Sequence, residues 1–344
     1  LKLLGRPASG AGPCAVAYPA GRGAMASGTL ASQLRIGGFL AVQFAFQPFL
    51  TRWYVDPRAI KSSVVVTCEL LKLITCVIVL VFNGGIAQWQ PSDTLWAAGP
   101  PALSYTAQNL LSQTAYQNLD GVTFNVINQT KVLFNALFVF MALGDGQSKV
   151  QVFALCLIFL ASVLVSLGEE SRGHAAGASV AAEDAIVGAA CCLASSALSG
   201  LGSTISEVVL VRRKRSTLLF SAELAALSVV TLVVNLAFDV NGDGQRAQAE
   251  GLFVAWNEWT WLPVLTNSLG GIAVGAVTKH MGGVRKGIAI TFGLVLSAAL
   301  RVVFTGKPVT TSILVALPLA SVGIVLHMAQ PRLRKGDAKD SKKA

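Results

Sequence analysis

Residues 105–131 read YTAQNLLSQTAYQNLDGVTFNVINQTK, and this stretch is the most informative part of the chain. It begins in one apolar segment, turns at Asp120-Gly121, and continues into a second apolar segment that carries a single lysine, Lys131. Amides, tyrosines and a cation are costly inside a lipid bilayer unless they face a cavity or a ligand. The stretch therefore predicts a binding site at membrane depth for a polar, anionic ligand.

The composition of the whole chain agrees with a membrane location. Of 344 residues, 53% are hydrophobic and only 13% are charged, whereas a soluble domain carries roughly a quarter charged residues. Several apolar runs are long enough to cross a hydrocarbon core of ~30 Å. The sequence predicts an all-α membrane protein with about ten transmembrane helices. The expected spans are 35–54, 62–83, 95–117, 121–142, 148–168, 185–211, 217–239, 254–278, 285–305 and 308–328.

The order of these spans suggests two halves. We expect residues 1–32 to be a disordered leader, with Met25 as the candidate true start. The first five-helix repeat then covers 33–168 and the second covers 185–328, joined by a luminal linker at 169–184 and followed by a basic cytosolic tail at 329–344. Because five is odd, two successive repeats must have inverted topologies, which is a common design in transporters.

The net charge of +10 is distributed as in a membrane protein. Lys and Arg gather in the loops on one side, around the run Arg212-Arg213-Lys214-Arg215, and in the tail. The positive-inside rule places that side, and both termini, in the cytosol. This clustering argues against nucleic acid as the partner and makes the lipid bilayer the expected one.

Lys131 and Lys286 are the sharpest candidates for anion binding. A lysine at the centre of a span costs roughly 2.5–3.5 kcal/mol, so Lys131 needs either a carboxylate on another helix or a wet, anion-binding cavity. Arg285 and Lys286 follow a Gly-rich turn at the expected start of a helix, where free N–H groups suit phosphate. Alternatively, they are ordinary flanking charges on the cytosolic side.

Other charges and small residues also fall inside the spans. Glu69 and Lys72 are three residues apart and share a helix face, either as a structural pair or in the site. Glu207 and Arg301 are alternative partners for each other or for Lys131. The small residues around Ser199-Gly200 and Gly270-Gly271 allow close helix packing, or line a passage.

Evidence for metal or enzyme chemistry is weak. Asp239, Asn241, Asp243 and Glu250 fit a calcium-loop pattern, but Arg246 occupies a position that is normally apolar and there is no second loop of this kind. No phosphate-binding loop or nucleophile motif is present, so we expect neither an enzyme nor a cofactor.

Four segments together resemble the nucleotide-sugar transporters, in the branch that carries CMP-sialic acid, UDP-galactose and UDP-N-acetylglucosamine. They are Val66–Leu73, with its E-x-x-K pattern; Gln108 to Lys131, with Asn118-Leu119-Asp120-Gly121 and Gln129-Thr130-Lys131; Ser199-Gly200 with Glu207; and Gly270-Gly271 with Lys279, Lys286-Gly287 and Ser297. The match runs roughly from Gln33 to Gln330.

The resemblance implies a ten-helix inverted-repeat fold and a function. The chain would exchange a cytosolic pyrimidine nucleotide sugar, a UDP-sugar or CMP-sialic acid, for a luminal nucleoside monophosphate. Lys131 and Lys286 would contact the phosphates, and Glu69 and Lys72 would lie on the sugar side. The implied substrate-binding residues are Lys131, Lys286, Asn109, Gln108, Glu69, Lys72, Gln129, Lys279, Ser199, Gly200 and Gly271.

The sequence leaves the cargo and the setting partly open. Leu110, Phe124 and Asn128 depart from the family pattern, so the individual substrate is not implied. The tail has no clear dilysine signal, which favours the Golgi membrane over the endoplasmic reticulum. Association as a homodimer or with glycosyltransferases fits this setting. The alternatives are a transport-inactive paralogue that scaffolds glycosyltransferases, and an exporter of another phosphorylated metabolite.

Overall fold

The computed structural model describes residues 30–119, 121–170, 182–239, 242–305, 311–330 and 333–334. Most of the expected leader, linker and tail lies outside these residues, and residues 30–32 of the expected leader belong to the first helix. The helices of the bundle are α1 (Leu30–Tyr54), α2 (Lys61–Phe82), α4 (Gly99–Asn118), α5 (Gly121–Asn128), α6 (Lys131–Leu143), α7 (Lys149–Glu170), α8 (Ala182–Glu207), α9 (Thr217–Ala237), α11 (Trp261–Met281), α12 (Gly283–Thr305) and α13 (Thr311–Ala329). The connecting elements are η2 (Gly85–Gln88), α3 (Pro91–Ala97), η3 (Val208–Arg212), α10 (Asp243–Glu250), η4 (Glu258–Thr260), β1 (Asp145–Gly146) and β2 (Leu333–Arg334).

Length and apolarity make this an all-α membrane protein. Among the described residues, eight helical segments of at least 18 residues are apolar enough to cross a bilayer. Many of their large apolar side chains remain exposed, including Ile78, Leu137 and Leu160, as expected for surfaces that face lipid chains. Helices α1 and α4 have 25 and 20 residues and are richer in polar side chains, so the count of ten spans stays a prediction.

The expected span 121–142 is in fact two helices, α5 and α6, with a break at Gln129 and Thr130. The Gln129 N–H is shared between the carbonyls of Asn125 and Val126. The Thr130 hydroxyl donates to the Ile127 carbonyl at 2.6 Å, and such back-bonding bends helices. Because of this break, α6 begins at Lys131, inside the membrane span.

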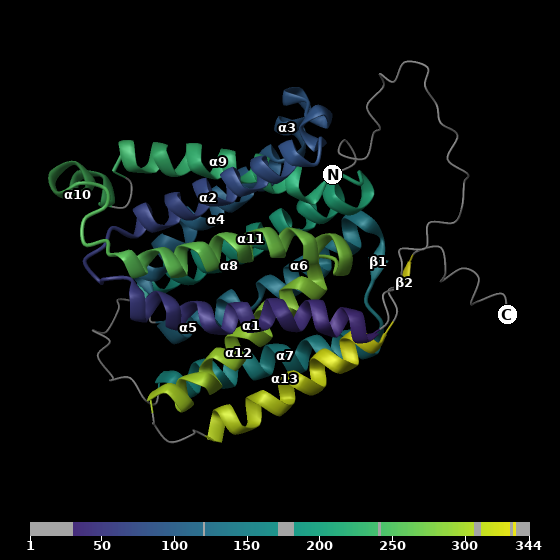
Figure 1. The fold of residues 1–344 in the computed structure, drawn as a ribbon. Coiled ribbons are helices and arrows are strands. Elements are labelled where there is room, and N and C mark those ends of the chain that lie inside the picture. Colours follow the sequence, from purple (N-terminus) through teal and green to yellow (C-terminus); the bar gives the residue numbers. More distant parts are fainter. Residues whose placement is uncertain are drawn as a thin grey trace, which may run out of the picture.

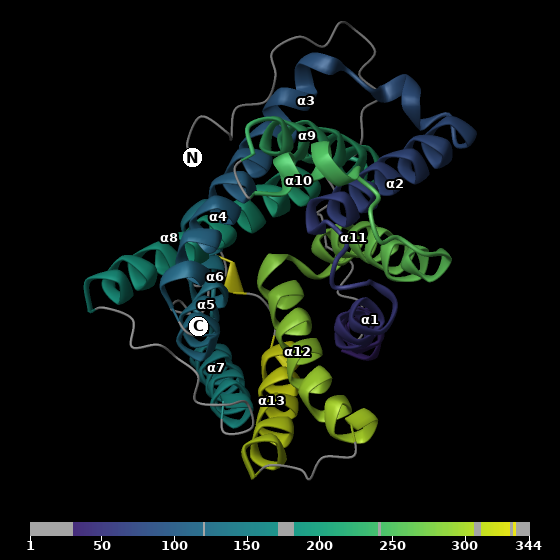
Figure 2. The ribbon, with the colours of Figure 1, turned by 90° about the vertical axis from the view of Figure 1, so that its left-hand side faces the viewer.

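The two halves of the chain interlock (Figure 1, Figure 2). Helix α1 packs on α11 and α12, while α8 packs on α4 and α6. Helix α2 packs on α9 and α11, α4 packs on α9, and α7 packs on α13. The helices α1, α2, α4, α5–α6 and α7 of the first half can be matched in order with α8, α9, α11, α12 and α13 of the second half. Under this matching, the contacts of α1 with α11 and α12 correspond to those of α8 with α4 and α6, and the contact of α2 with α11 corresponds to that of α9 with α4. The contacts of α2 with α9 and of α7 with α13 correspond to themselves.

The largest apolar cluster lies where these halves meet. It contains buried residues of α1, α6, α7, α11, α12 and α13, among them Leu40, Val132, Ile158, Met281, Ile288 and Ile324. Figure 2 shows α12 between α1 on one side and α6 and α7 on the other. Helix α12 is therefore packed against elements of both halves.

The two ends of the bundle differ (Figure 1). At one end, called here the β1 end, β1 pairs with β2 in an antiparallel ladder that joins Asp145 to Arg334 and Gly146 to Leu333. At the opposite end, called the α10 end, Asp243 at the start of α10 accepts hydrogen bonds from the backbone and hydroxyl of Ser62 at 3.0 and 2.6 Å.

Candidate functional site

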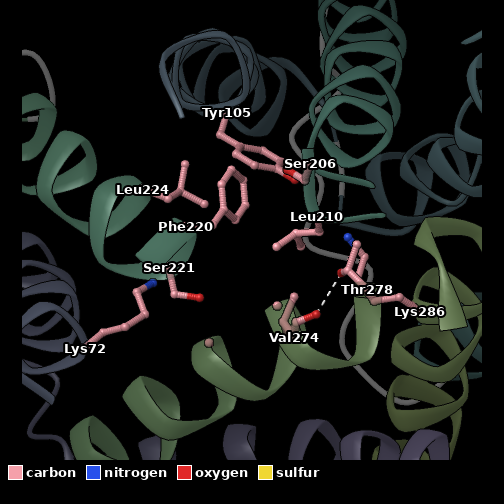
Figure 3. Close-up of a pocket in the computed structure, with 12 residues that line it drawn as sticks. Lys72, Tyr105, Ser206, Leu210, Phe220, Ser221, Leu224, Val274, Thr278 and Lys286 are labelled. Atoms are coloured by element: carbon pink, nitrogen blue, oxygen red, sulfur yellow. Dashed lines mark hydrogen bonds between the residues drawn. The ribbon is translucent and has the colours of Figure 1, made fainter. Parts of the chain in front are cut away.

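A cavity of about 60 Å³, with both polar and apolar side chains on its walls, lies among α2, α4, α8, α9, α11 and α12 (Figure 3). Lys72 and Lys286 approach it from opposite sides, and the rings of Tyr105 and Phe220 line another wall. A cavity of this volume holds only a few water molecules. The helices must therefore separate before a ligand as large as a nucleotide can enter.

Lys286 enters the cavity from the first turn of α12. Its ammonium donates to the Ser203 hydroxyl of α8 at 2.8 Å. Beside it, the Glu207 carboxylate, which is fully buried, accepts the Gly283 N–H at 2.6 Å. Glu207 thus occupies one free N–H group at the helix N-terminus, where an anion is stabilised by the helix dipole.

On the other side of the cavity, Lys72 pairs with Glu69. The predicted pair forms with a distance of 2.6 Å between Lys72 Nζ and Glu69 Oε1. Lys72 extends across α11 at Gly271, where an added Cβ would be 3.1 Å from Lys72 Cδ and 3.2 Å from Nζ. Gly271 therefore makes room for the lysine and also lines the cavity.

Lys131 lies at the first position of α6 and faces α8. Within the described residues, its ammonium has no hydrogen-bond or ion-pair partner. The thiol of Cys192 on α8 lies close enough to interact electrostatically. A carboxylate partner for Lys131, the structural alternative considered above, is therefore not found in the described part of the chain.

The neighbouring amides take different positions. Gln129 is 8% exposed and lines a second cavity of about 150 Å³ with Asn125, Ser166 and Arg301. Gln108 lies on α4, and its carbonyl accepts the Ser195 hydroxyl at 3.2 Å. Asn109 follows it and is exposed. These amides do not line the cavity between Lys72 and Lys286.

Three further candidates contact protein groups instead of this cavity. Lys279 donates to the Arg215 carbonyl at 3.0 Å, which joins the end of α11 to the turn before α9. At Gly200, an added Cβ would be 2.8 Å from the Asn135 nitrogen and 2.9 Å from Phe134 Cβ, so this glycine allows α8 and α6 to touch. Ser199 beside it is partly buried.

Sequence reasoning did not select several residues of the cavity wall. Tyr105 stands at the start of the stretch quoted first, but only the amides after it were selected. The apolar and hydroxyl lining was missed because such residues look like ordinary packing in a membrane helix. The residues concerned are Tyr105, Ser206, Leu210, Phe220, Ser221, Leu224 and Thr278.

The described members of the calcium-loop pattern have separate partners. Asp239 accepts the Gly244 and Gln245 N–H groups at 2.7 and 3.1 Å, and Glu250 pairs with Arg246 at 3.2 Å. Asp243 accepts the hydrogen bonds from Ser62 described above, and Asn241 lies outside the described residues. In the part of the chain that the structure describes, no group of three His, Cys, Asp or Glu side chains could hold a metal ion.

The fold and this interior define a multi-pass membrane protein with cations and polar groups at bilayer depth. Its sequence matches the nucleotide-sugar transporter family over residues 40–327. The chain belongs to this family, whose members are transporters and not enzymes.

Two relatives and one solved structure extend this result. A UDP-N-acetylglucosamine transporter of Arabidopsis thaliana is 38% identical over 300 residues, covering 86% of this chain and 91% of the relative. A UDP-N-acetylglucosamine transporter of Homo sapiens is 27% identical over 270 residues, covering 75% of this chain and 81% of the relative. A crystal structure with 13% sequence identity superposes with a TM-score of 0.65 over 87% of this chain and 98% of its own, which supports the fold alone.

Proposed function

We propose that this protein exchanges a cytosolic UDP-sugar for a luminal nucleoside monophosphate across the Golgi membrane, by alternating access. UDP-N-acetylglucosamine is the favoured cargo because the two relatives described above carry that name. CMP-sialic acid, which the sequence also suggested, is the second choice.

The observation that carries the proposal is the position of Lys131. An unpaired ammonium at bilayer depth is costly unless it meets water or an anion, and Lys131 has no partner among the described residues. It also stands at the start of α6, at a helix break inside the span. Ion and substrate sites lie at breaks in membrane helices in many transporters.

Lys286 supports the same reading from the other half of the chain. Its ammonium donates to the neutral Ser203 hydroxyl and interacts electrostatically with the neighbouring Glu207 carboxylate. Its remaining N–H groups can donate to a phosphate oxygen. Lys72 is already neutralised by Glu69, which suits contact with the uncharged sugar better than contact with the diphosphate. Tyr105 and Phe220 offer ring surfaces to a base.

The interlocked halves support alternating access. The pairings of α1 with α12 and of α8 with α6 are those that an inverted repeat would produce. The basic loops on the β1 side favour a cytosolic β1 end and a luminal α10 end. Association as a homodimer or with glycosyltransferases is part of the same proposal.

The test is exchange in proteoliposomes. Vesicles loaded with UMP should take up UDP-N-acetylglucosamine faster than empty vesicles, and external UMP should compete better than GMP. Lys131→Ala and Lys286→Ala should each abolish exchange, because each removes a cation that would hold the phosphates. Lys149→Ala, at an exposed position at the start of α7, is the matched control and should exchange normally.

Each outcome decides between the alternatives. Folded protein that gives no trans-stimulated uptake of any nucleotide sugar would favour a scaffold. Uptake that nucleoside monophosphates do not inhibit would favour an exporter of another phosphorylated metabolite. Retained exchange in both lysine variants would contradict the binding site proposed here.

A further inference from the structure

A buried polar cluster closes the β1 end of the bundle, next to the candidate site. Arg285 donates to the Gln33 side chain at 2.7 Å and to the Gln330 carbonyl at 2.8 Å. His327 Nε2 and Gln147 Oε1 are 3.0 Å apart. These contacts join the start of α1, the loop before α7, the start of α12 and the end of α13.

Two further contacts complete this cluster. Gln151, which is 1% exposed, donates to the Gln330 carbonyl at 3.4 Å. Glu207 holds the N-terminus of α12 through Gly283. In the sequence, β1 of the β1–β2 ladder ends directly before Gln147, and β2 begins three residues after Gln330. The space left among these groups is only about 10 Å³, which is too small for a bound ligand.

The α10 end has an open counterpart of this cluster. The cavity of about 150 Å³ is formed there by the ends of α1, α7 and α12 and the start of α5, through Pro48, Ser166, Arg301 and Asn125. In the matching of the two halves, α1, α5, α7 and α12 are equivalent to α8, α12, α13 and α6, respectively. The cluster at the β1 end contains residues of those four helices, including Glu207, Arg285, His327 and Val139.

The two cavities are therefore equivalent places in the two halves, but one is open and the other is closed. The open one has polar groups on a largely apolar wall. Ser162 and Ser166 donate back to their own helix, and the buried Gln129 Oε1 has no partner among the described residues. In an inverted-repeat carrier, the two halves place equivalent sites on opposite sides of the membrane, and alternating access opens one of these sites while the other is closed.

We propose that the cluster of Gln33, Gln147, Gln151, Glu207, Arg285 and His327 is the cytosolic gate of this carrier. Arg285 couples the gate to cargo, because it is adjacent to Lys286 on the first turn of α12. A phosphate that draws Lys286 into the cavity moves the turn that Arg285 anchors, which releases Gln33 and Gln330. This inference rests on the proposed function for the identity of the cargo and for the cytosolic position of the β1 end.

A reducible cross-link across the gate gives the sharpest test. In a background with the native cysteines replaced, Gln147→Cys and His327→Cys should be joined by a bifunctional methanethiosulfonate reagent, whose spacer replaces the length of the two side chains that meet there. The cross-link should abolish UDP-N-acetylglucosamine exchange, and its reduction should restore exchange. The cross-linked protein should still bind UMP from the luminal side. A matched pair, Ser62→Cys with Asp243→Cys, joins α2 to α10 at the opposite end and should leave exchange unchanged when cross-linked with the same reagent.

Labelling gives a second measurement that does not depend on cross-linking. Gln151→Cys should react slowly with an impermeant maleimide from the β1 side. Its rate should rise several-fold with UDP-N-acetylglucosamine, and also with Arg285→Ala in the absence of cargo. Exchange by the cross-linked gate pair, or a labelling rate that neither change alters, would overturn the gate. Absence of exchange in the wild-type protein would instead contradict the proposed function.

Discussion

Gly271 on α11 lies directly against the side chain of Lys72 on α2, so that an added Cβ would be 3.2 Å from the ammonium. The adjacent Gly270 makes room for a different partner, because an added Cβ there would overlap the side-chain amide of Gln43 on α1. The double glycine therefore allows side chains of two different helices, α1 and α2, to pack closely against α11. One position shapes the cavity and the other fixes the packing of α1.

The two glycines should give different phenotypes. Gly271→Ala should displace only the flexible end of Lys72, leaving the protein folded but raising the KM for exchange. Gly270→Ala should collide with the Gln43 amide, which is held in place by Thr266 and Gln47, and lower stability by about 1–3 kcal/mol. Thermal unfolding in detergent and exchange kinetics measure the two effects, and equal unfolding temperatures would contradict this division.

Lys131 and Lys72 should also respond differently to replacement by methionine. Lys131→Met leaves no described group without a partner, so the variant should be at least as stable as the wild type although it cannot exchange. Lys72→Met leaves Glu69 unpaired and should cost about 2 kcal/mol, between the values for exposed and buried pairs.

The Lys72 effect has an internal control. Adding Glu69→Gln to Lys72→Met should recover much of the lost stability, because the orphaned charge is removed. A double variant that unfolds as easily as Lys72→Met alone would show that the ion pair is not the cause. Chemical unfolding of the purified proteins gives the comparison.

Gly200 and Gly287 form a matched pair for helix packing. Gly200→Ala should cost about 1–3 kcal/mol, because the new methyl group would meet the backbone nitrogen of Asn135 at 2.8 Å. At Gly287 the nearest atom to an added Cβ is 3.9 Å away, so Gly287→Ala should be neutral or stabilising. Similar losses in both variants would indicate a general intolerance of alanine and not a specific contact.

Glu223 gives a test of a buried ion pair outside the cavity. It is 4% exposed, accepts Arg215 Nε at 2.9 Å, and also accepts the Thr94 hydroxyl at 2.6 Å. Glu223→Ala should cost about 3–5 kcal/mol by leaving the Arg215 charge unpaired. Glu223→Ala with Arg215→Met should lose less than Glu223→Ala alone, as measured by a double-mutant cycle.

The sequence predicted the helical class and most span boundaries because the length of an apolar run must match the thickness of the hydrocarbon core. It did not predict the break before Lys131, since that break depends on the Thr130 hydroxyl bonding to its own helix. The Glu69–Lys72 pair was predictable from its spacing of three residues. The partner of Lys279 was not, because it is a backbone carbonyl 64 residues away, which no side-chain pattern reveals.

The candidate site was predicted unevenly for a similar reason. A lysine at membrane depth stands out by its cost, so the sequence singles out Lys131. The structure places Lys72 and Lys286 on the wall of the cavity and Lys131 outside it, and their contact with cargo stays a prediction. Tyr105 and Phe220 are compatible with simple packing, and only the assembled fold shows them on the wall of the cavity. Glu207 was recognised as a buried charge, but its bond to the Gly283 N–H depends on where α12 begins.

The packing of α1 on α11 has a consequence for biosynthesis. Gln47 on α1 donates to the Pro263 carbonyl on α11 at 2.9 Å, across a separation of 216 residues. The ribosome therefore delivers α1 to the membrane long before its hydrogen-bonding partner has been translated. Until then the glutamines of α1 must be sheltered by water, lipid headgroups or an insertion factor. A nascent chain that stops before α11 should remain exposed to quality control even though most of its helices are already inserted.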